Sequence, residues 1–439
     1  MNEEHQFFVI IHPRHDTNSV FCWLWIGLNA SNMSDEEMVP EASDAEPAEE
    51  EIQAEEYDND LTTEHTYLGR DLETLTGRTF TEDGSIQSML VFQELPMLIP
   101  GETLPLKFYH PGKIKLLSNV IKRKQLFGVL HPGQKQYGTT AEIRNYKLVV
   151  QGSAEPRPCL TVIAEGIKQF QLMEELLRHQ LRFVKVQILK DVTLQSPEKR
   201  LLLERQRDRG LMTTCSPWPR FLYNQFDKKY LVQKVSEAIA PFVKKKIPPC
   251  TDPVKFSYWA AANSPVNSHE RRLLLAASCT QDRLRMALVY LSLNCDICCK
   301  GCHEVISSKA YIISMSRSGA QGTFVNRVGY VHNLLTVGQI RRIIYQGARD
   351  ESFSWYPGYA WTIGNCSECH RHLGWKFDTV KHLKPATFWA LSRENIEFRV
   401  LMTQDRLTAA QETAELFAEQ ENDEDADDQG ALHENLYWF

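Results

Sequence analysis

From about residue 87 the chain becomes dense in short apolar runs of the kind that form β-strands, such as SMLVF, KLVV and RFVKVQIL. Gly and Pro interrupt these runs in segments such as LIPGETLPL. Strands separated by such turn residues are typical of a compact β structure. Residues 87–190 are therefore predicted to form a mostly β domain.

Residues 221–294 show a helical pattern instead. In FLYNQFDKKYLVQKVSEAIAPFV the apolar positions recur at close to helical spacing, and three further helices are predicted over 253–294. Ser268 is the expected N-cap of the second of these three. Its capping box is incomplete, because Arg271 rather than Glu or Gln stands three residues later.

After Leu293 the composition changes to cysteines, aromatics and short strands, through about residue 400. The pattern as a whole predicts an α+β multidomain protein. A mostly β domain with a helical bundle is expected over 87–293, and a zinc-bound all-β domain over 294–402. Acidic disordered regions are expected over 1–75 and 407–439.

The charge distribution explains why disorder is expected at the two ends. Residues 1–69 carry 17 Asp or Glu and a single basic residue, and residues 407–439 carry 10 Asp or Glu and no basic residue. Such segments repel themselves and have few large apolar groups to bury. The middle of the chain is basic by comparison, but its charges are mostly scattered, so nucleic-acid binding is only weakly indicated.

The apolar run VFCWLWIGL at 20–28 is about half of the roughly 20 residues that a membrane span needs. A signal peptide is an alternative, but the preceding residues lack a strongly basic start. A start at Met33, or a disordered extension, is favoured over secretion.

Six of the eleven cysteines lie in two clusters, CDICCKGC at 295–302 and CSEC at 366–369. Separated C-x-x-C elements in a chain without a convincing secretion signal indicate a zinc site. From spacing alone, either Cys295 with Cys298 or Cys299 with Cys302 could supply the first pair. We choose the second pair, because a flexible Lys-Gly lies between its cysteines. The predicted ligands of one structural zinc are Cys299, Cys302, Cys366 and Cys369. His370 and His372 are interpreted as surface residues.

The segment SWYPGYAW at 354–361 holds two tryptophans around a Pro-Gly pair. Pro fixes φ and Gly tolerates the left-handed region, so a tight turn is predicted that folds Trp355 back toward Trp361. Trp375 and Phe377 are two residues apart and point to one face if they lie on a strand.

Three indoles and a phenyl ring could thus form a cage. A cage of this kind suits a cation, a stacked nucleobase or a small neutral ring. The alternative is that these rings form the small core of a zinc ribbon.

Several segments resemble known families. LPMLIPGETLPLKFYHP, GTTAEI and LTVIAEGIKQFQL resemble the N-terminal substrate-binding domain of Lon proteases, as do the helices that follow. The sequence has no G-x-x-x-x-G-K-[ST] phosphate loop, so this likeness implies a binding scaffold rather than an ATP-dependent protease. NCDICCKGC, NRVGYVH, SWYPGYAW, CSEC and GWKF, in this order, resemble the thalidomide-binding (CULT) domain of the cereblon family. The likeness covers about residues 65–395.

The resemblance implies a non-catalytic substrate receptor of a cullin-4 RING ubiquitin ligase, present in the nucleus and cytoplasm. Its helical bundle, about residues 190–293, would dock on the damage-binding adaptor protein of that ligase. Its zinc domain would bind substrates with C-terminal cyclic imides, and glutarimide small molecules. Neither membrane nor nucleic-acid binding is expected.

The resemblance also assigns site residues. Trp355, Trp361 and Trp375 would form three walls, with Phe377 below and Asn326 on a flexible segment that covers the pocket. The backbone around Phe353 would contact the imide. The vertebrate pattern has a histidine at position 353, and a second histidine at position 328, where this chain has Val. Weaker imide binding is therefore expected. The alternative function is a zinc-dependent reader of a nucleobase or methylated lysine without a ligase role.

Overall fold

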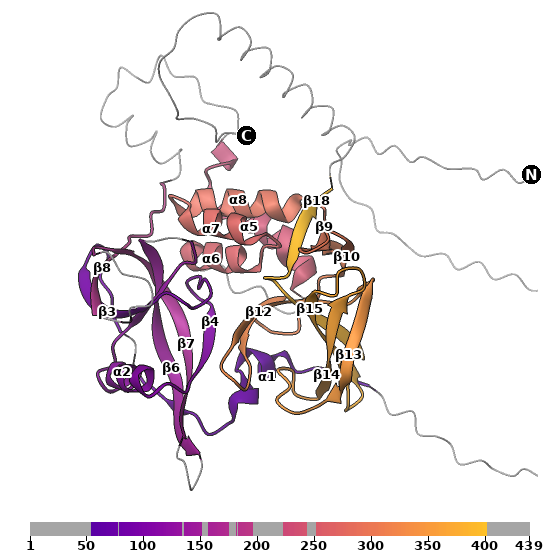
Figure 1. The fold of residues 1–439 in the computed structure, drawn as a ribbon. Helices are drawn as coiled ribbons and strands as arrows, with labels where there is room; N and C mark the ends of the chain where they lie inside the picture. Colours follow the sequence, from indigo (N-terminus) through magenta and orange to yellow (C-terminus); the bar gives the residue numbers. More distant parts are fainter. Residues whose placement is uncertain are drawn as a thin grey trace, which may run out of the picture. The chain divides into compact units, whose positions relative to one another are not determined.

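The computed structural model describes residues 54–401, except 78, 134–135, 152–156, 175–180, 182, 196–222 and 244–251. Within these limits the chain is α+β, as predicted, with a β-rich part, a helical region and a second β-rich part in sequence order (Figure 1). No helix among the described residues has both the length and the apolar character needed to cross a bilayer. The apolar run at 20–28 and the C-terminal acidic segment lie outside the described residues.

The first β-rich part is a seven-stranded sheet in the order β2-β6-β5-β3-β8-β7-β4, with a further pairing of β6 with β7. All neighbours are antiparallel except β3 and β5. The apolar residues of the strands fill two buried clusters, one around Leu90, Leu106 and Phe127 and another around Val91 and Phe170. The strands are β2 (Glu73–Thr74), β3 (Ile86–Phe92), β4 (Thr103–Phe108), β5 (Phe127–Leu130), β6 (Tyr137–Gln151), β7 (Arg157–Leu172) and β8 (Phe183–Ile188).

A helix that was not expected lies inside this mostly β part. It is α2 (Pro111–Lys122), and it buries Ile114, Leu117 and Val120 in the core of the sheet. Its sequence does carry helix signals, because His110 caps the N-terminus through its ring nitrogen and Pro111 occupies the first turn. The neighbouring strand-like runs obscured these signals.

The helical region consists of α5 (Lys228–Ile239), α6 (Pro253–Asn263), α7 (Ser268–Ala276) and α8 (Thr280–Ser292). The predicted helices are therefore present, but the cap of α7 is one residue earlier than expected. Asn267 is the N-cap, and Glu270 completes a capping box by accepting from the Asn267 backbone N–H at 2.5 Å. Counting from Asn267, the third residue is Glu270 rather than Arg271, so the box that the sequence seemed to lack is complete.

The second β-rich part, which we call the zinc domain (residues 295–401), holds two sheets. A three-stranded sheet has the order β10-β9-β18 and a six-stranded sheet has the order β11-β12-β17-β15-β14-β13. Leu335 and Leu391 of the larger sheet share one buried cluster with Leu284 of α8. The strands are β9 (Cys295–Cys299), β10 (Val305–Ser308), β11 (Gln321–Val325), β12 (Val331–Val337), β13 (Ile343–Asp350), β14 (Tyr359–Cys366), β15 (His372–Thr379), β17 (Thr387–Ser392) and β18 (Ile396–Val400).

Residues 54–74, which we call the N-terminal strap, are ordered, although residues 1–75 were expected to be disordered. The strap holds β1 (Glu55–Glu56), α1 (Asn59–Thr63), the 3-10 helix η1 (Thr66–Leu68) and β2, and β1 pairs with β16 (Leu383–Lys384). The disorder prediction was wrong here because it weighed charge and missed the aromatic residues. Tyr57 and Tyr67 both pack into a cluster of the zinc domain that includes Phe324.

Candidate ligand pocket and metal centre

The four predicted metal ligands converge at one point. Cys299 ends β9 and Cys366 ends β14, so each strand delivers one cysteine and the following turn delivers the other. The four Sγ atoms all lie within 4.8 Å of one another. The Sγ atoms of Cys299 and Cys369 are 3.5 Å apart, as are those of Cys302 and Cys366.

These separations fit zinc. Four thiolates at about 2.3 Å from a tetrahedral Zn²⁺ are about 3.8 Å apart. Gly301 leaves the space that the site needs, because a Cβ there would lie 3.1 Å from Cys369 Sγ. Four sulfur ligands leave no position for water or substrate, so the cluster holds one structural zinc.

The ambiguity in the first cluster is resolved in favour of Cys299 and Cys302. Cys295 and Cys298 are buried in β9, away from the four-cysteine group. The two histidines after the second knuckle are also outside this group. His370 is exposed in the turn, but His372 is half-buried with its ring centroid 4.6 Å from that of Trp375. His372 is therefore part of the aromatic site rather than a plain surface residue.

The turn predicted at Pro357-Gly358 is present. The Tyr359 N–H donates to the Tyr356 carbonyl at 3.0 Å, and Gly358 has φ of 95°. This positive φ is why glycine is suited to the position. The turn separates Trp355, which precedes it, from Trp361 on β14.

The register of β14 and β15 sets the next part of the site. Trp361 is the direct partner of Phe377, and Ile363 is the direct partner of Trp375. Directly paired residues project from the same face of a sheet, and so do residues two apart on one strand. Trp361, Trp375 and Phe377 thus share one face of the six-stranded sheet.

Phe377 is the floor of this face. It is fully buried and its ring stacks on that of Phe388, with centroids 5.1 Å apart and planes 9° apart. Tyr356 packs edge-on against both rings. A floor built this way is held in place by its own packing.

Trp355 approaches from the loop and completes the aromatic group. Its ring is edge-to-face with that of Trp375, with centroids 4.8 Å apart, and it is only 7% exposed. The Trp355 Nε1–H donates to the Val325 carbonyl at 3.2 Å, and the Trp361 Nε1–H donates to the Ser352 carbonyl at 3.0 Å. Each of these two indoles thus has its one polar hydrogen satisfied and its orientation set.

His332 on β12 is a member of the site that sequence reasoning missed. Its ring centroid lies 5.3 Å from that of Trp355 and 4.9 Å from that of Trp375. Burial, with a smaller contribution from nearby His372, lowers the pKa of His332 to about 4, so the ring is neutral at physiological pH. The motif NRVGYVH contains His332, but only the pairing of β12 with β17 brings it beside the indoles.

Residues 326–330, which we call the covering segment, form a tight turn between β11 and β12. The Asn326 side-chain oxygen accepts from the backbone N–H groups of Val328 at 3.1 Å and Tyr330 at 2.9 Å. Asn326 thus organises the turn. Phe353 lies on the neighbouring loop with φ of 55° and is 54% exposed.

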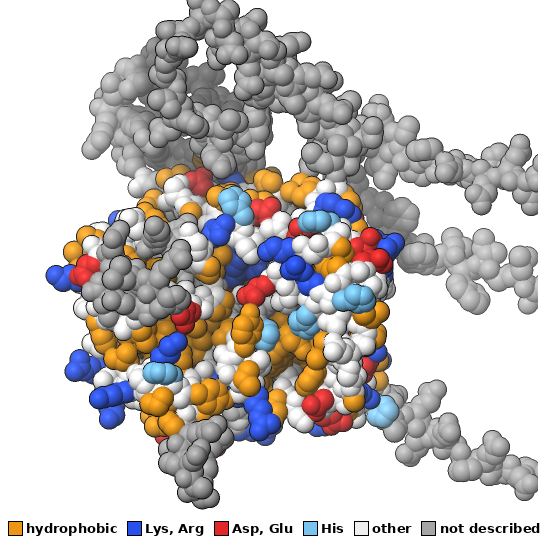
Figure 2. Space-filling model, viewed as in Figure 1, with side chains coloured by type: hydrophobic (Ala, Val, Ile, Leu, Met, Phe, Trp, Pro, Cys, Tyr) orange, Lys and Arg blue, Asp and Glu red, His pale blue; other side chains and the backbone are white. Residues whose placement is uncertain are grey.

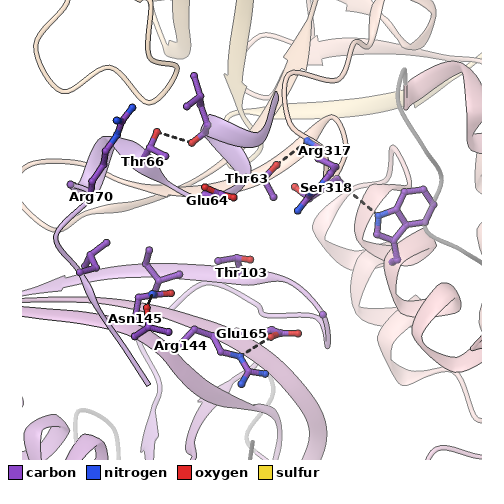
Figure 3. Close-up of a pocket in the computed structure, with 17 residues that line it drawn as sticks. Thr63, Glu64, Thr66, Arg70, Thr103, Arg144, Asn145, Glu165, Arg317 and Ser318 are labelled. Atoms are coloured by element: carbon purple, nitrogen blue, oxygen red, sulfur yellow. Dashed lines mark hydrogen bonds and ion pairs between the residues drawn. The ribbon is translucent and has the colours of Figure 1, made fainter. Parts of the chain in front are cut away.

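A cavity of about 1290 Å³ lies elsewhere, between the N-terminal strap, the seven-stranded sheet and Trp259 (Figure 3). Thr63 accepts from the Arg317 backbone N–H at 2.9 Å, and Arg144 donates to Glu165 at 2.8 Å. Arg144 also pairs with Glu142 at 2.6 Å. These polar groups of the cavity are therefore used in contacts that stabilise the strap and the sheet. None of the predicted site residues lines the cavity.

Comparison with family models agrees with this division of the chain. Residues 88–292 match the ATP-dependent protease La (LON) substrate-binding domain, and residues 295–411 match the Yippee zinc-binding/DNA-binding/Mis18 family. The first match combines the seven-stranded sheet with the helical region, and the second begins at β9.

Whole-chain comparison extends across both parts. The chain is 32% identical over 392 residues to protein cereblon of Gallus gallus, covering 80% of this chain and 87% of that protein. It is 32% identical to protein cereblon of Xenopus tropicalis, covering 84% and 91%, and 31% identical to that of Danio rerio, covering 77% and 86%. With its Lon-type substrate-binding domain and its four-cysteine zinc domain, this chain belongs to the cereblon family.

Proposed function

We propose that this protein is the substrate-recognition subunit of a cullin-4 RING ubiquitin ligase, acting in the nucleus and cytoplasm. It would bind C-terminal cyclic imides, and glutarimide small molecules, in the pocket bounded by Trp355, Trp361 and Trp375. It would direct the bound proteins to ubiquitination and proteasomal degradation without catalysing a reaction itself. The observation that carries this proposal is the convergence of the three indoles and Phe377, in a member of the cereblon family.

The chemistry of the site favours a small neutral ring. Cyclic imides present flat faces to indoles and place two carbonyls and an N–H at the ring edge. The backbone around Phe353 and Trp355 would supply the complementary donors and acceptors. His332 and His372 have lowered pKa values because of burial, so neither ring adds a positive charge at neutral pH.

A methyl-lysine or nucleobase reader is the second candidate, and it fits the same residues less well. A cation reader would use a carboxylate beside the rings, but Asp378 alternates with Trp375 and Phe377 along β15, so it projects from the other face, where it pairs with Lys376 at 3.0 Å. Nucleobase binding would be helped by several basic residues among the aromatics. In SWYPGYAW and GWKF the one basic residue is Lys376, which projects from the opposite face of β15.

The adaptor-binding surface is proposed to lie in the helical region, of which the structure describes α5 to α8. Lys228 and Lys229 are exposed at the start of α5, and Tyr230 beside them is partly exposed. Charge reversal of both lysines should reduce co-purification of the adaptor protein. Lys381→Glu, an exposed site in the zinc domain, is the matched control. Undiminished co-purification of the double variant would exclude this end of α5 as a docking surface.

The imide site is tested by calorimetric titration of the zinc-loaded full chain with a peptide ending in a cyclic imide. The wild type should show saturable binding, and Trp361→Ala should lose it while keeping its zinc. Trimethyl-lysine peptide and free nucleoside are titrated in parallel. Saturable binding of either of these, with none of the imide, would favour the reader function instead.

A further inference from the structure

A cation beside the aromatic cage, Arg327, is held by contacts to two other parts of the chain. The Arg327 guanidinium carbon lies 4.9 Å from the centroid of the Phe353 ring. Arg327 belongs to the covering segment and Phe353 to the loop before the Pro-Gly turn, so this cation–π contact joins the two loops beside the indoles. Stacking on a ring face leaves the in-plane N–H donors of a guanidinium available to a carboxylate.

The backbone of the covering segment is held against the seven-stranded sheet. The Tyr109 hydroxyl donates to the Arg327 carbonyl. Gly329 has φ of 93°, and a Cβ there would lie 2.8 Å from the Lys107 carbonyl on β4. The close approach brings Lys107 and Arg327 into the same neighbourhood, one from each β-rich part.

Neither of these two cations makes an ion pair within the described residues. Burial has the largest effect on the pKa of Lys107 and lowers it, Cys159 raises it, and the charge of Arg327 lowers it. Two like charges near each other create a local positive potential that a negative group would relieve. The surroundings of Arg327 and Lys107 therefore favour binding of an anion, whereas the aromatic cage beside them suits a neutral ring.

The position of a substrate residue relative to the terminal ring determines whether that residue can contact these two cations. The Val325 carbonyl accepts a hydrogen bond from Trp355 Nε1–H. Arg327 follows Val325 by two residues, so the chain reaches Arg327 directly after contacting this indole of the cage. An extended peptide advances about 3.3 Å per residue. A peptide with its terminal ring in the cage would bring the residue just before that ring within reach of the covering segment.

We propose that Arg327 and Lys107 form a subsite for an acidic side chain, so that this protein prefers substrates with Asp or Glu immediately before the C-terminal cyclic imide. Phe353 acts as a positioning residue that orients the guanidinium. This inference rests on the proposed function and adds the substrate class to it.

The test compares three peptides that differ only in the residue before the imide, which is Glu, Gln or Lys. Each is titrated by calorimetry into the zinc-loaded full chain at low salt. The Glu peptide should bind about fivefold more tightly than the Gln peptide, with the Lys peptide weakest, as expected for partly exposed charge pairs. The differences should shrink in 0.5 M salt because exposed charges are screened.

Variants then assign the preference to the residues. Arg327→Gln, at an exposed position, should bring the Glu and Gln peptides to nearly equal affinity. Phe353→Leu should weaken the Glu preference while leaving both cations. Lys381→Gln, an exposed cation of the same domain, should keep the full preference.

Equal affinities for the three peptides in the wild type would overturn the subsite and leave the proposed function standing. A Glu preference that survives in Arg327→Gln would also overturn it. Binding of none of the three peptides by a zinc-loaded chain would reject the proposed function, and the subsite with it.

Discussion

Trp361 and Phe377 are directly paired across β14 and β15, which places an indole beside a fully buried phenyl ring. The zinc-binding Cys366 ends the same β14 strand, and Cys369 lies in the turn that leads into β15. The hairpin of β14 and β15 therefore carries residues of both the metal centre and the aromatic group. A change that shifts its register would affect both.

Phe353→His should strengthen imide binding, with a dissociation constant about two- to tenfold lower than that of the wild type. An imidazole can add a side-chain hydrogen bond worth roughly 0.5–1.5 kcal/mol, and His adopts the left-handed region more readily than Phe. Titration of the full chain with one cyclic-imide peptide measures the change. Phe353→Leu is the control, since it cannot form this bond. Equal gains in both variants would show that the imidazole is not responsible.

Cys369→Ser should abolish stoichiometric zinc binding, whereas Cys298→Ser should retain one zinc per chain. Losing one of four thiolates from a closed tetrahedral site removes much of the binding free energy, and this free energy stabilises the fold. Metal analysis of the purified variants gives the stoichiometry, and thermal unfolding with and without chelator gives the stability. Zinc lost from Cys298→Ser but kept in Cys369→Ser would contradict the ligand assignment.

Gly374→Ala should destabilise the zinc domain by about 3 kcal/mol or more. A Cβ at Gly374 would lie 2.1 Å from the Ala390 carbonyl oxygen of β17, which is backbone and cannot move aside alone. Gly347→Ala is the matched control, because its φ of 85° is also positive but its Cβ would have open space. That control should cost only about 1 kcal/mol. Denaturant unfolding compares the two, and equal losses would show that φ rather than steric overlap decides.

His65→Asn should make stability less sensitive to acid. Burial lowers the pKa of His65 from 6.5 to about 4, so the unfolded chain takes up a proton first as the pH falls. The stability that depends on neutral His65 is present above about pH 6.5 and is lost as the pH falls toward 4. At pH 5.5 the loss from this one group is about 1 kcal/mol.

Asn suits this position because His65 has φ of 52°, a conformation that Asn tolerates. The variant should be less stable than the wild type at pH 7.5, since it loses the packing of the ring against Phe324 and Tyr67. Its thermal midpoint should fall less between pH 7.5 and 5.5 than that of the wild type. Parallel curves for the two proteins would show that His65 does not titrate in this range.

On the face shown in Figure 2, Lys and Arg side chains are interspersed with acidic and apolar ones. This agrees with the scattered basic charges of the sequence.

Some features of the fold and site could be read from the sequence because they depend on local chemistry. Paired C-x-x-C elements, a Pro-Gly turn, helical periodicity over 221–294 and strand runs over 87–190 each reflect the conformational preferences of a few neighbouring residues. The same local reasoning passed over α2, whose helical signals lie among strand-like runs. It also passed over the strap, whose aromatic residues become informative only once Phe324 is beside them.

The sequence by itself determined the inventory: two cysteine clusters, three tryptophans and Phe377, with the secondary structure that carries most of them. Only the tertiary structure decided which thiols meet, since Cys295 and Cys298 have the same spacing as Cys299 and Cys302 but are directed elsewhere by β9. It also decided that His332 lies against the indoles and that Arg327 stacks on Phe353. These contacts join residues far apart in the chain, and strand pairing, which local preferences do not specify, brings them together.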